Sequence, residues 1–136
     1  MTVAELARGV LDTSVFIASE TGRQLDAARL PLKAAISPVT VAELHVGVLV
    51  ARDVDARARR IATLDAVADI ELLPIDAAVA ASWALLRVHL AQDGRRLNVN
   101  DLWIAATALA HGVPVVTQDD DFGPVDGIAG LIVVRV

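Results

Sequence analysis

Short apolar runs recur along this chain with longer segments between them, and that alternation restricts its fold more than any other feature. The runs are GVL (9–11), AAI (34–36), IELLPID (70–76), VPVVT (113–117) and LIVVRV (131–136). Short apolar runs bounded by turn residues are typical of strands buried on both faces. Their alternation with helical segments predicts a largely parallel sheet with helices on both sides. We therefore expect a three-layer α/β/α sandwich with about five strands.

The segments between these runs carry helical patterns with recognisable ends. Thr40 and Asn100 are candidate N-caps because their side chains can accept hydrogen bonds from the first helical amides. Pro38 separates the second strand from the helix after it, and Gly112 is a candidate C-terminal stop. The expected helices are residues 21–35, about 40–68, 77–92 and about 101–111.

Size and composition indicate one domain over residues 1–136, since 55% apolar content can form a substantial core. The chain has no cysteine, which excludes disulfides and thiolate metal sites. The start, MTVAELARGVLD, carries Glu5 and lacks the basic and long apolar parts of a secretory leader. No uncharged apolar run approaches the roughly 18 residues that span a bilayer. We expect a cytoplasmic protein that does not enter a membrane.

Acidic residues follow several of the expected strands. Asp12 comes after the first strand, Glu43 lies at the start of the helix after the second, Asp101 opens a later helix, and Asp119 follows VPVVT. In open parallel sheets, ligands bind beyond the carboxyl ends of the strands. Four acids that are far apart in sequence are thus expected at one edge of the sheet.

Each acid also has a purely structural interpretation. Thr40 and Glu43 fit a T-x-x-E capping box, and Asp101 suits the positive end of a helix dipole. Residues 119–121 fit a solvated turn. Asp12 is the hardest to explain in this way, because a carboxylate after a buried strand is desolvated unless a positive or hydrogen-bonding group meets it.

A shared divalent cation would account for all four positions together. Carboxylates held within a few ångströms repel one another and raise each other's pKa values. Oxygen ligands without Cys or His favour Mg²⁺ or Mn²⁺, and such ions contact phosphate oxygens. A phosphodiester could therefore bind to a protein whose net charge of −5 argues against a surface that simply coats nucleic acid.

Other candidate residues keep two interpretations each. The hydroxyl of Ser14 could orient a phosphate or a metal-bound water, or it could close a turn. Arg95 and Arg96 could hold substrate phosphates, or belong to a solvated loop. A serine hydrolase is weakly supported because G-x-S-x-G is missing, and there is no glycine-rich phosphate loop. The three histidines are alternatives as metal ligands or general acids, but structural or surface roles are favoured for them: His45, His89 and His111.

Four motifs in order, LDTSVFI, VTVAELHVG, NDLWIAATALAHG and VVTQDDDFG, cover nearly the whole chain. This pattern resembles the PIN-domain ribonucleases, specifically the VapC-like toxins of type II (VapBC) toxin–antitoxin pairs. The resemblance implies catalytic roles for the matching acids, which are Asp12, Glu43, Asp101 and Asp119. It implies metal binding by Asp12, Asp101, Asp119 and also Asp121, because TQDDDF matches the family's T-x-D-x-D-F with Asp120 as the spacer.

The same resemblance implies an activity and partners. These are Mg²⁺- or Mn²⁺-dependent endoribonuclease cleavage of a cellular RNA such as transfer or ribosomal RNA, a homodimer, and a VapB-like antitoxin that blocks the acidic site. The apolar segments 46–50 and 77–86 are candidates for a partner groove or dimer face, although helical apolar stripes more often pack in the core.

Two other classes of function stay open at the level of sequence. A receiver-like signalling domain would bind Mg²⁺ through clustered acids, but it would need a lysine after a late strand, and the chain has only Lys33. A phosphotransferase with a D-x-D loop is weakened because position 14 is serine. The remaining possibility is a catalytically silent PIN module. All four acidic positions of the motifs are filled, which argues against such a loss of the site.

Overall fold

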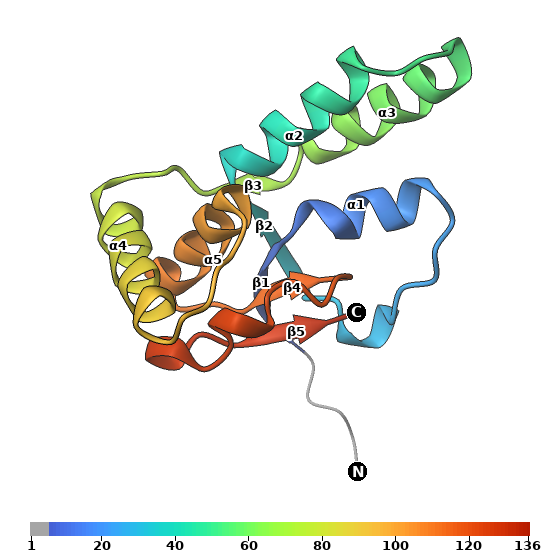
Figure 1. Ribbon diagram of the computed structural model, residues 1–136. Coiled ribbons are helices and arrows are strands. Elements are labelled where there is room, and N and C mark those ends of the chain that lie inside the picture. Colours follow the sequence, from blue (N-terminus) through green and yellow to red (C-terminus); the bar gives the residue numbers. More distant parts are fainter. Residues whose placement is uncertain (1–5) are drawn as a thin grey trace.

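The computed structural model describes residues 6–136 and contains a parallel sheet of five strands (Figure 1). The expectation that the chain starts without a secretory leader rests largely on residues outside this described part. The strands, each preceded or followed by a helix, have the order β3-β2-β1-β4-β5 across the sheet. Their bounds are β1 Arg8–Leu11, β2 Lys33–Ile36, β3 Glu71–Leu72, β4 Val115–Thr117 and β5 Val133–Arg135.

The strand order reverses direction at β1. The chain moves outward from β1 to β2 and β3, and then returns to place β4 on the other side of β1. Val10 of β1 is accordingly in register with Ala35 on one side and Val115 on the other. A ligand crevice is expected where two neighbouring strands lead to opposite halves of the sheet, which here is beyond the carboxyl ends of β1 and β4.

Successive residues of the central strands enter different cores, because side chains alternate across a strand. Val10 and Val115 pack with the helices of one layer, whereas Leu11 and Val116 pack with those of the other. The helices α4 (Ala77–Gln92) and α5 (Val99–His111) form the first layer. The second layer consists of α1 (Thr13–Glu20), α2 (Pro38–Leu49) and α3 (Val54–Val67). The expected three-layer α/β/α sandwich is confirmed.

The second helical layer is divided differently from the expectation. The single helix predicted from Thr40 to about Ala68 is wrong, because α2 and α3 form a hairpin that projects beyond the sheet (Figure 1). Asp53 caps α3 by accepting a hydrogen bond from the amide of Ala56 at 2.7 Å, which starts a new helix. Nη1 of Arg60 donates to the carbonyl oxygen of Gly47 at 2.6 Å and links the two helices.

The predicted helix over residues 21–35 is also wrong. The helix lies earlier, at Thr13–Glu20, and Asp12 is its N-cap. Gly22 takes a left-handed conformation (φ +75°) that ends the helix, and a single 3₁₀ turn, η1 (Ala27–Arg29), precedes β2. Asp12 therefore follows a strand and is also the N-cap of the next helix. The pattern of apolar runs does not indicate this double role.

The helices beside the first core agree better with the sequence. The helix over residues 77–92 is confirmed, and Gly112 ends α5 in a left-handed conformation as expected. The N-cap of α5 is Asn98 rather than Asn100, because Oδ1 of Asn98 accepts from the amide of Asn100 at 2.9 Å. Within residues 6–136, every helix is too short or too polar to cross a bilayer.

Candidate active site

A cleft of about 260 Å³ lies beyond the carboxyl ends of β1 and β4, and we call it the acid cleft. It brings together the five acids that the sequence analysis singled out, from the residue after β1, from α2, from α5 and from the loop after β4. None of the three histidines lines it, and all three are exposed. The lining residues are Asp12, Thr13, Ser14, Ile17, Arg23, Glu43, Asn98, Asp101, Asp119 and Asp121.

Asp12 joins the two central strands at the floor of the cleft. Asp12 is only 3% exposed. Its Oδ2 atom accepts hydrogen bonds from Oγ1 of Thr117 at 3.1 Å and from the amide of Ser14 at 3.4 Å. Burial raises the pKa of the Asp12 carboxyl, while these hydrogen bonds act in the opposite direction. Asp12 is thus both a helix cap and a desolvated carboxylate in the cleft.

A chain of hydroxyl groups fixes the loop after β4 against the start of α1. Oγ of Ser14 lies 3.2 Å from Oγ1 of Thr117 and accepts from the amide of Gln118 at 3.0 Å. Oγ1 of Thr117 also accepts from the amide of Asp119 at 3.0 Å. These bonds set the position of Asp119 relative to Asp12. The Ser14 hydroxyl has this structural role, and its predicted contact with substrate stays a prediction.

Glu43 does not take part in a capping box. The N-cap of α2 is Ser37, with Pro38 at the first helical position, so Thr40 lies inside the helix and Glu43 in its second turn. Oε1 of Glu43 accepts instead from Oγ1 of Thr13 at 2.8 Å. The structural interpretation of Glu43 is therefore wrong, and its carboxylate faces the cleft.

The negative charges of the other four acids of the cleft act on Asp101. It lies in the first turn of α5 and is partly buried. Burial, followed by the negative charges of the other lining acids, raises the pKa of Asp101 to about 7. The helix dipole favours an acid here, but it does not explain why four further acids converge on it. Those acids, in order of effect, are Asp12, Glu43, Asp121 and Asp119.

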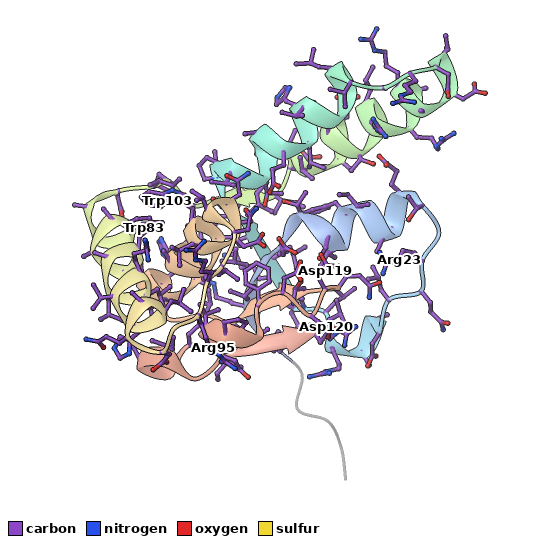
Figure 2. All side chains as sticks on the ribbon, viewed as in Figure 1. Arg23, Trp83, Arg95, Trp103, Asp119 and Asp120 are labelled. Carbon is purple, nitrogen blue, oxygen red and sulfur yellow. The ribbon has the colours of Figure 1, made fainter. Side chains whose placement is uncertain are left out.

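The three consecutive acids after β4 point in different directions. Asp119 and Asp121 line the cleft, whereas Asp120 does not. The side chain of Asp120 is 78% exposed and forms an ion pair with Arg135 of β5. Figure 2 shows Asp119 and Asp120 diverging from the same loop. This arrangement agrees with Asp120 as a spacer between two acids of the cleft.

The donor atoms of the cleft suit a hard divalent cation, because the convergent side chains offer carboxylate oxygens and no nitrogen or sulfur of His or Cys. As the side chains stand, no three His, Cys, Asp or Glu groups of residues 6–136 are arranged around a common ion position. Mg²⁺ is commonly held by one or two carboxylates, with water and phosphate oxygens completing its shell. The chemistry of the cleft fits that mode of binding.

Arg23 is a lining residue that the sequence analysis missed. It is the sole Lys or Arg among the residues described at the cleft, and it follows Gly22 at the end of α1. Its position at the cleft was not predicted, because residues 21–35 were expected to form a helix. Arg95 and Arg96, by contrast, do not line the acid cleft. They line a neighbouring pocket of about 540 Å³ that shares Asn98 with it.

Comparison with known proteins gives consistent results. The family model described as PIN domain matches residues 9–128. Ribonuclease VapC5 of Mycobacterium tuberculosis is 58% identical over 130 residues, 96% of each chain, and ribonuclease VapC4 of the same organism is 45% identical over 116 residues, 85% of this chain and 88% of that protein.

Solved structures show the same relationship. A chain in the crystal structure of VapBC-5, a toxin–antitoxin system of M. tuberculosis, superposes with a TM-score of 0.90 and 56% identity, covering 96% of this chain and 99% of that one. A chain of FitAcB from Neisseria gonorrhoeae has a TM-score of 0.74 and 26% identity, covering 93% and 96%. The sequence motifs, the sheet order and these matches agree, and the chain belongs to the PIN-domain family as a relative of the VapC ribonucleases.

Proposed function

We propose that this protein is a metal-dependent endoribonuclease that acts as the toxin of a toxin–antitoxin pair. The observation that carries the proposal is the convergence of five acids in one cleft, where burial together with the neighbouring negative charges raises the pKa of Asp101 to about 7. Carboxylates that converge on one cleft repel one another and destabilise the fold unless they serve a ligand, and a divalent cation is the ligand that they fit. The relatives named ribonucleases support RNA as the substrate.

Each acid has a role in this proposal. Asp12, Asp101 and Asp119 would hold Mg²⁺ or Mn²⁺, with Asp121 as a further ligand. When bound, the ion supplies charge neutralisation for the phosphodiester and lowers the pKa of water. Glu43, held by Thr13 at 2.8 Å, would orient the attacking water and accept its proton. The guanidinium of Arg23, which also lines the cleft, would bind the phosphate.

We further propose a VapB-like antitoxin as the partner. The solved relative with 56% identity comes from a VapBC toxin–antitoxin system. The end of the hairpin helix α2 and its C-cap expose three large apolar side chains, Val46, Leu49 and Val50, of which Leu49 is 73% exposed. Burying such a group against a partner helix would be favourable. We also expect a single PIN domain over residues 1–136, which the family match to residues 9–128 supports.

The homodimer expected from the family resemblance is part of the same proposal. Helix α4 exposes Leu85 and Val88 on the outer surface of its layer, which is the kind of apolar face that a second copy would cover. The receiver-like alternative loses support, because receivers have the strand order 2-1-3-4-5, whereas this sheet has the order 3-2-1-4-5.

Cleavage of RNA by purified protein tests the proposal. The full chain is incubated with total RNA and Mg²⁺ or Mn²⁺, beside Asp12→Asn and beside Asp69→Asn, an exposed acid outside the cleft. We expect cleavage by the parent and by Asp69→Asn, and none by Asp12→Asn. Equal cleavage by all three proteins would reject the assignment. Failure of the parent to bind Mn²⁺ in a titration would favour a catalytically silent PIN module.

A further inference from the structure

A second pocket of about 540 Å³ opens beside the acid cleft, and we call it the arginine pocket. Its volume is within the range of roughly 300–1,000 Å³ that is usual for ligand sites. It lies where α4 meets the loop that enters α5. The lining residues are Trp83, Arg87, Leu90, Arg95, Arg96, Leu97, Asn98, Val99 and Leu102.

The lining of this pocket combines apolar and cationic groups. The apolar part includes Trp83, which stacks on Trp103 with ring centroids 5.2 Å apart and an interplanar angle of 24°, as Figure 2 shows between α4 and α5. Guanidinium groups come from Arg87 on α4 and from the adjacent pair Arg95 and Arg96. Sites for single-stranded nucleic acid combine these two chemistries, one for the base and one for the phosphate.

The three guanidinium groups have no acidic partner in the described chain. Within residues 6–136 the ion pairs are Arg8 with Glu71 and Arg135 with Asp120. Arg87, Arg95 and Arg96 are all exposed. A protein with a net charge of −5 thus keeps a local group of three unpaired cations, which favours an anionic ligand at this place.

The arginine pocket and the acid cleft meet at a shared residue. Asn98 lines both, and it caps α5, the helix that carries Asp101 into the cleft. Arg95 and Arg96 precede Asn98 by only a few residues. A polynucleotide whose phosphodiester lies in the acid cleft therefore meets the arginine pocket with a neighbouring nucleotide.

We infer that the arginine pocket binds a nucleotide of single-stranded RNA next to the phosphodiester in the acid cleft, with Arg87, Arg95 and Arg96 on the phosphates that flank this nucleotide and the apolar lining against the base. The inference rests on the proposed function for its substrate. It assigns affinity for RNA to a surface that has no acid, whereas cleavage belongs to the acid cleft. The two properties can therefore be lost separately.

Binding of a fluorescein-labelled single-stranded RNA oligonucleotide, followed by anisotropy in Mg²⁺ at several salt concentrations, tests this inference. The Asp12→Asn chain serves as the parent, and gels check that the RNA stays intact. Arg95→Gln/Arg96→Gln is compared with Arg29→Gln/Arg52→Gln, two exposed arginines outside the pocket that give the same change in charge. Thermal unfolding confirms that both double variants fold.

We expect the pocket variant to bind RNA about 10-fold more weakly or worse, and the control variant to bind within about twofold of the parent. The slope of log K against log salt should become shallower by about 1.4, because each single-strand phosphate that the protein no longer neutralises reduces the slope by about 0.7. Val99→Ser, a change at a 62% exposed apolar lining residue, should weaken binding without changing the slope.

Equal losses in the pocket and control variants would overturn the inference, since general charge alone would then explain binding. It would also be overturned if Arg95→Gln/Arg96→Gln bound RNA normally but changed dimerisation or binding of an acidic protein partner. If the wild-type chain never cut RNA but the pocket variants lost RNA binding as expected, the proposed function would fail and this site would stand.

Discussion

Oγ1 of Thr117 donates a hydrogen bond to Oδ2 of Asp12 at 3.1 Å, and so joins the ends of two strands that are 105 residues apart in sequence. The same hydroxyl oxygen accepts from the amide of Asp119 at 3.0 Å. One threonine therefore stabilises the charged form of Asp12 and positions a second acid of the cleft. Thr117 is fully buried and lies at the point where the sheet order reverses. Its buried hydroxyl group has hydrogen-bond partners there in Asp12 and the amide of Asp119.

Thr117→Val should damage both stability and cleavage. Hydrogen bonds to charged groups contribute about 1.5–3 kcal/mol, so we expect the free energy of unfolding to fall by about 2 kcal/mol in urea denaturation. The pKa of Asp12 should rise further, because burial already raises it and the variant removes one opposing hydrogen bond. The acid limb of the pH–cleavage profile should therefore move to higher pH.

Thr107→Val is the matched control for that change. Thr107 is also fully buried, but its hydroxyl donates to the carbonyl oxygen of Trp103 within α5, away from the acids. Its loss should leave the pH–cleavage profile where it is. If both threonine variants moved the profile equally, the bond from Thr117 to Asp12 would have no specific role.

The stability of the protein in EDTA should fall as the pH rises from about 4 to about 7. The pKa of Asp101 is raised from 3.8 to about 7 in the fold, so the folded state holds a proton there that the unfolded state has released. This stabilisation is fully present below the unfolded-state pKa of 3.8, and it is lost as the pH rises through the folded-state pKa of about 7. Melting temperatures across this window should show a smaller decline in Asp101→Asn than in Asp69→Asn, an exposed control acid.

Addition of Mg²⁺ should reverse part of that decline. A cation in the acid cleft favours the ionised carboxylates, so its effect on the melting temperature should be larger at pH 8 than at pH 5. Asp101→Asn should reduce the effect of Mg²⁺, whereas Asp69→Asn should not. A pH-independent effect of Mg²⁺, equal in all three proteins, would place the ion outside the acid cleft.

The fold and the acids of the site could be predicted because they depend on local patterns. Strand-length apolar runs determined the layers, and the strand ends placed Asp12 and Asp119 at one rim. The helix boundaries of the second layer could not be predicted in this way. Asp12 has one side chain that serves as cap and site residue, and the position of Arg23 depends on a left-handed turn at Gly22. The arginine pocket needs packing between α4 and α5, which no single segment encodes.

Asp119 and Asp120 should respond differently to the same substitution. Asp119→Asn should abolish detectable RNA cleavage, because Asp119 lines the cleft and contributes to the pKa of Asp101. Asp120→Asn should retain most cleavage and lower stability by no more than about 1 kcal/mol, since its ion pair with Arg135 is exposed. Loss of activity in Asp120→Asn with retention in Asp119→Asn would show that the register of the T-x-D-x-D-F motif is wrong.

Gly9→Ala and Gly47→Ala should change stability in opposite directions. A Cβ atom at Gly9 in β1 would lie 2.7 Å from Cγ2 of Val116, a fully buried side chain in β4. Because Val116 is rigid at χ1 and has no free space, we expect the variant to lose about 1–3 kcal/mol. At Gly47, inside α2, the nearest atom is Cδ of Arg60 at 3.8 Å, which is ordinary contact, so alanine should add about 0.5–1 kcal/mol through its higher helix propensity.

The Gly9 variant should also affect the site, because the amide nitrogen of Asp12 donates a hydrogen bond to the carbonyl oxygen of Val116, with 2.8 Å between the two atoms. A displacement of β4 from β1 would therefore separate the two sides of the acid cleft. We expect lower cleavage per folded molecule in Gly9→Ala and unchanged cleavage in Gly47→Ala, with urea denaturation and the RNA assay run on the same preparations. Equal stability and activity of Gly9→Ala and the wild type would mean that the close packing of β1 on β4 does not set the geometry of the acids.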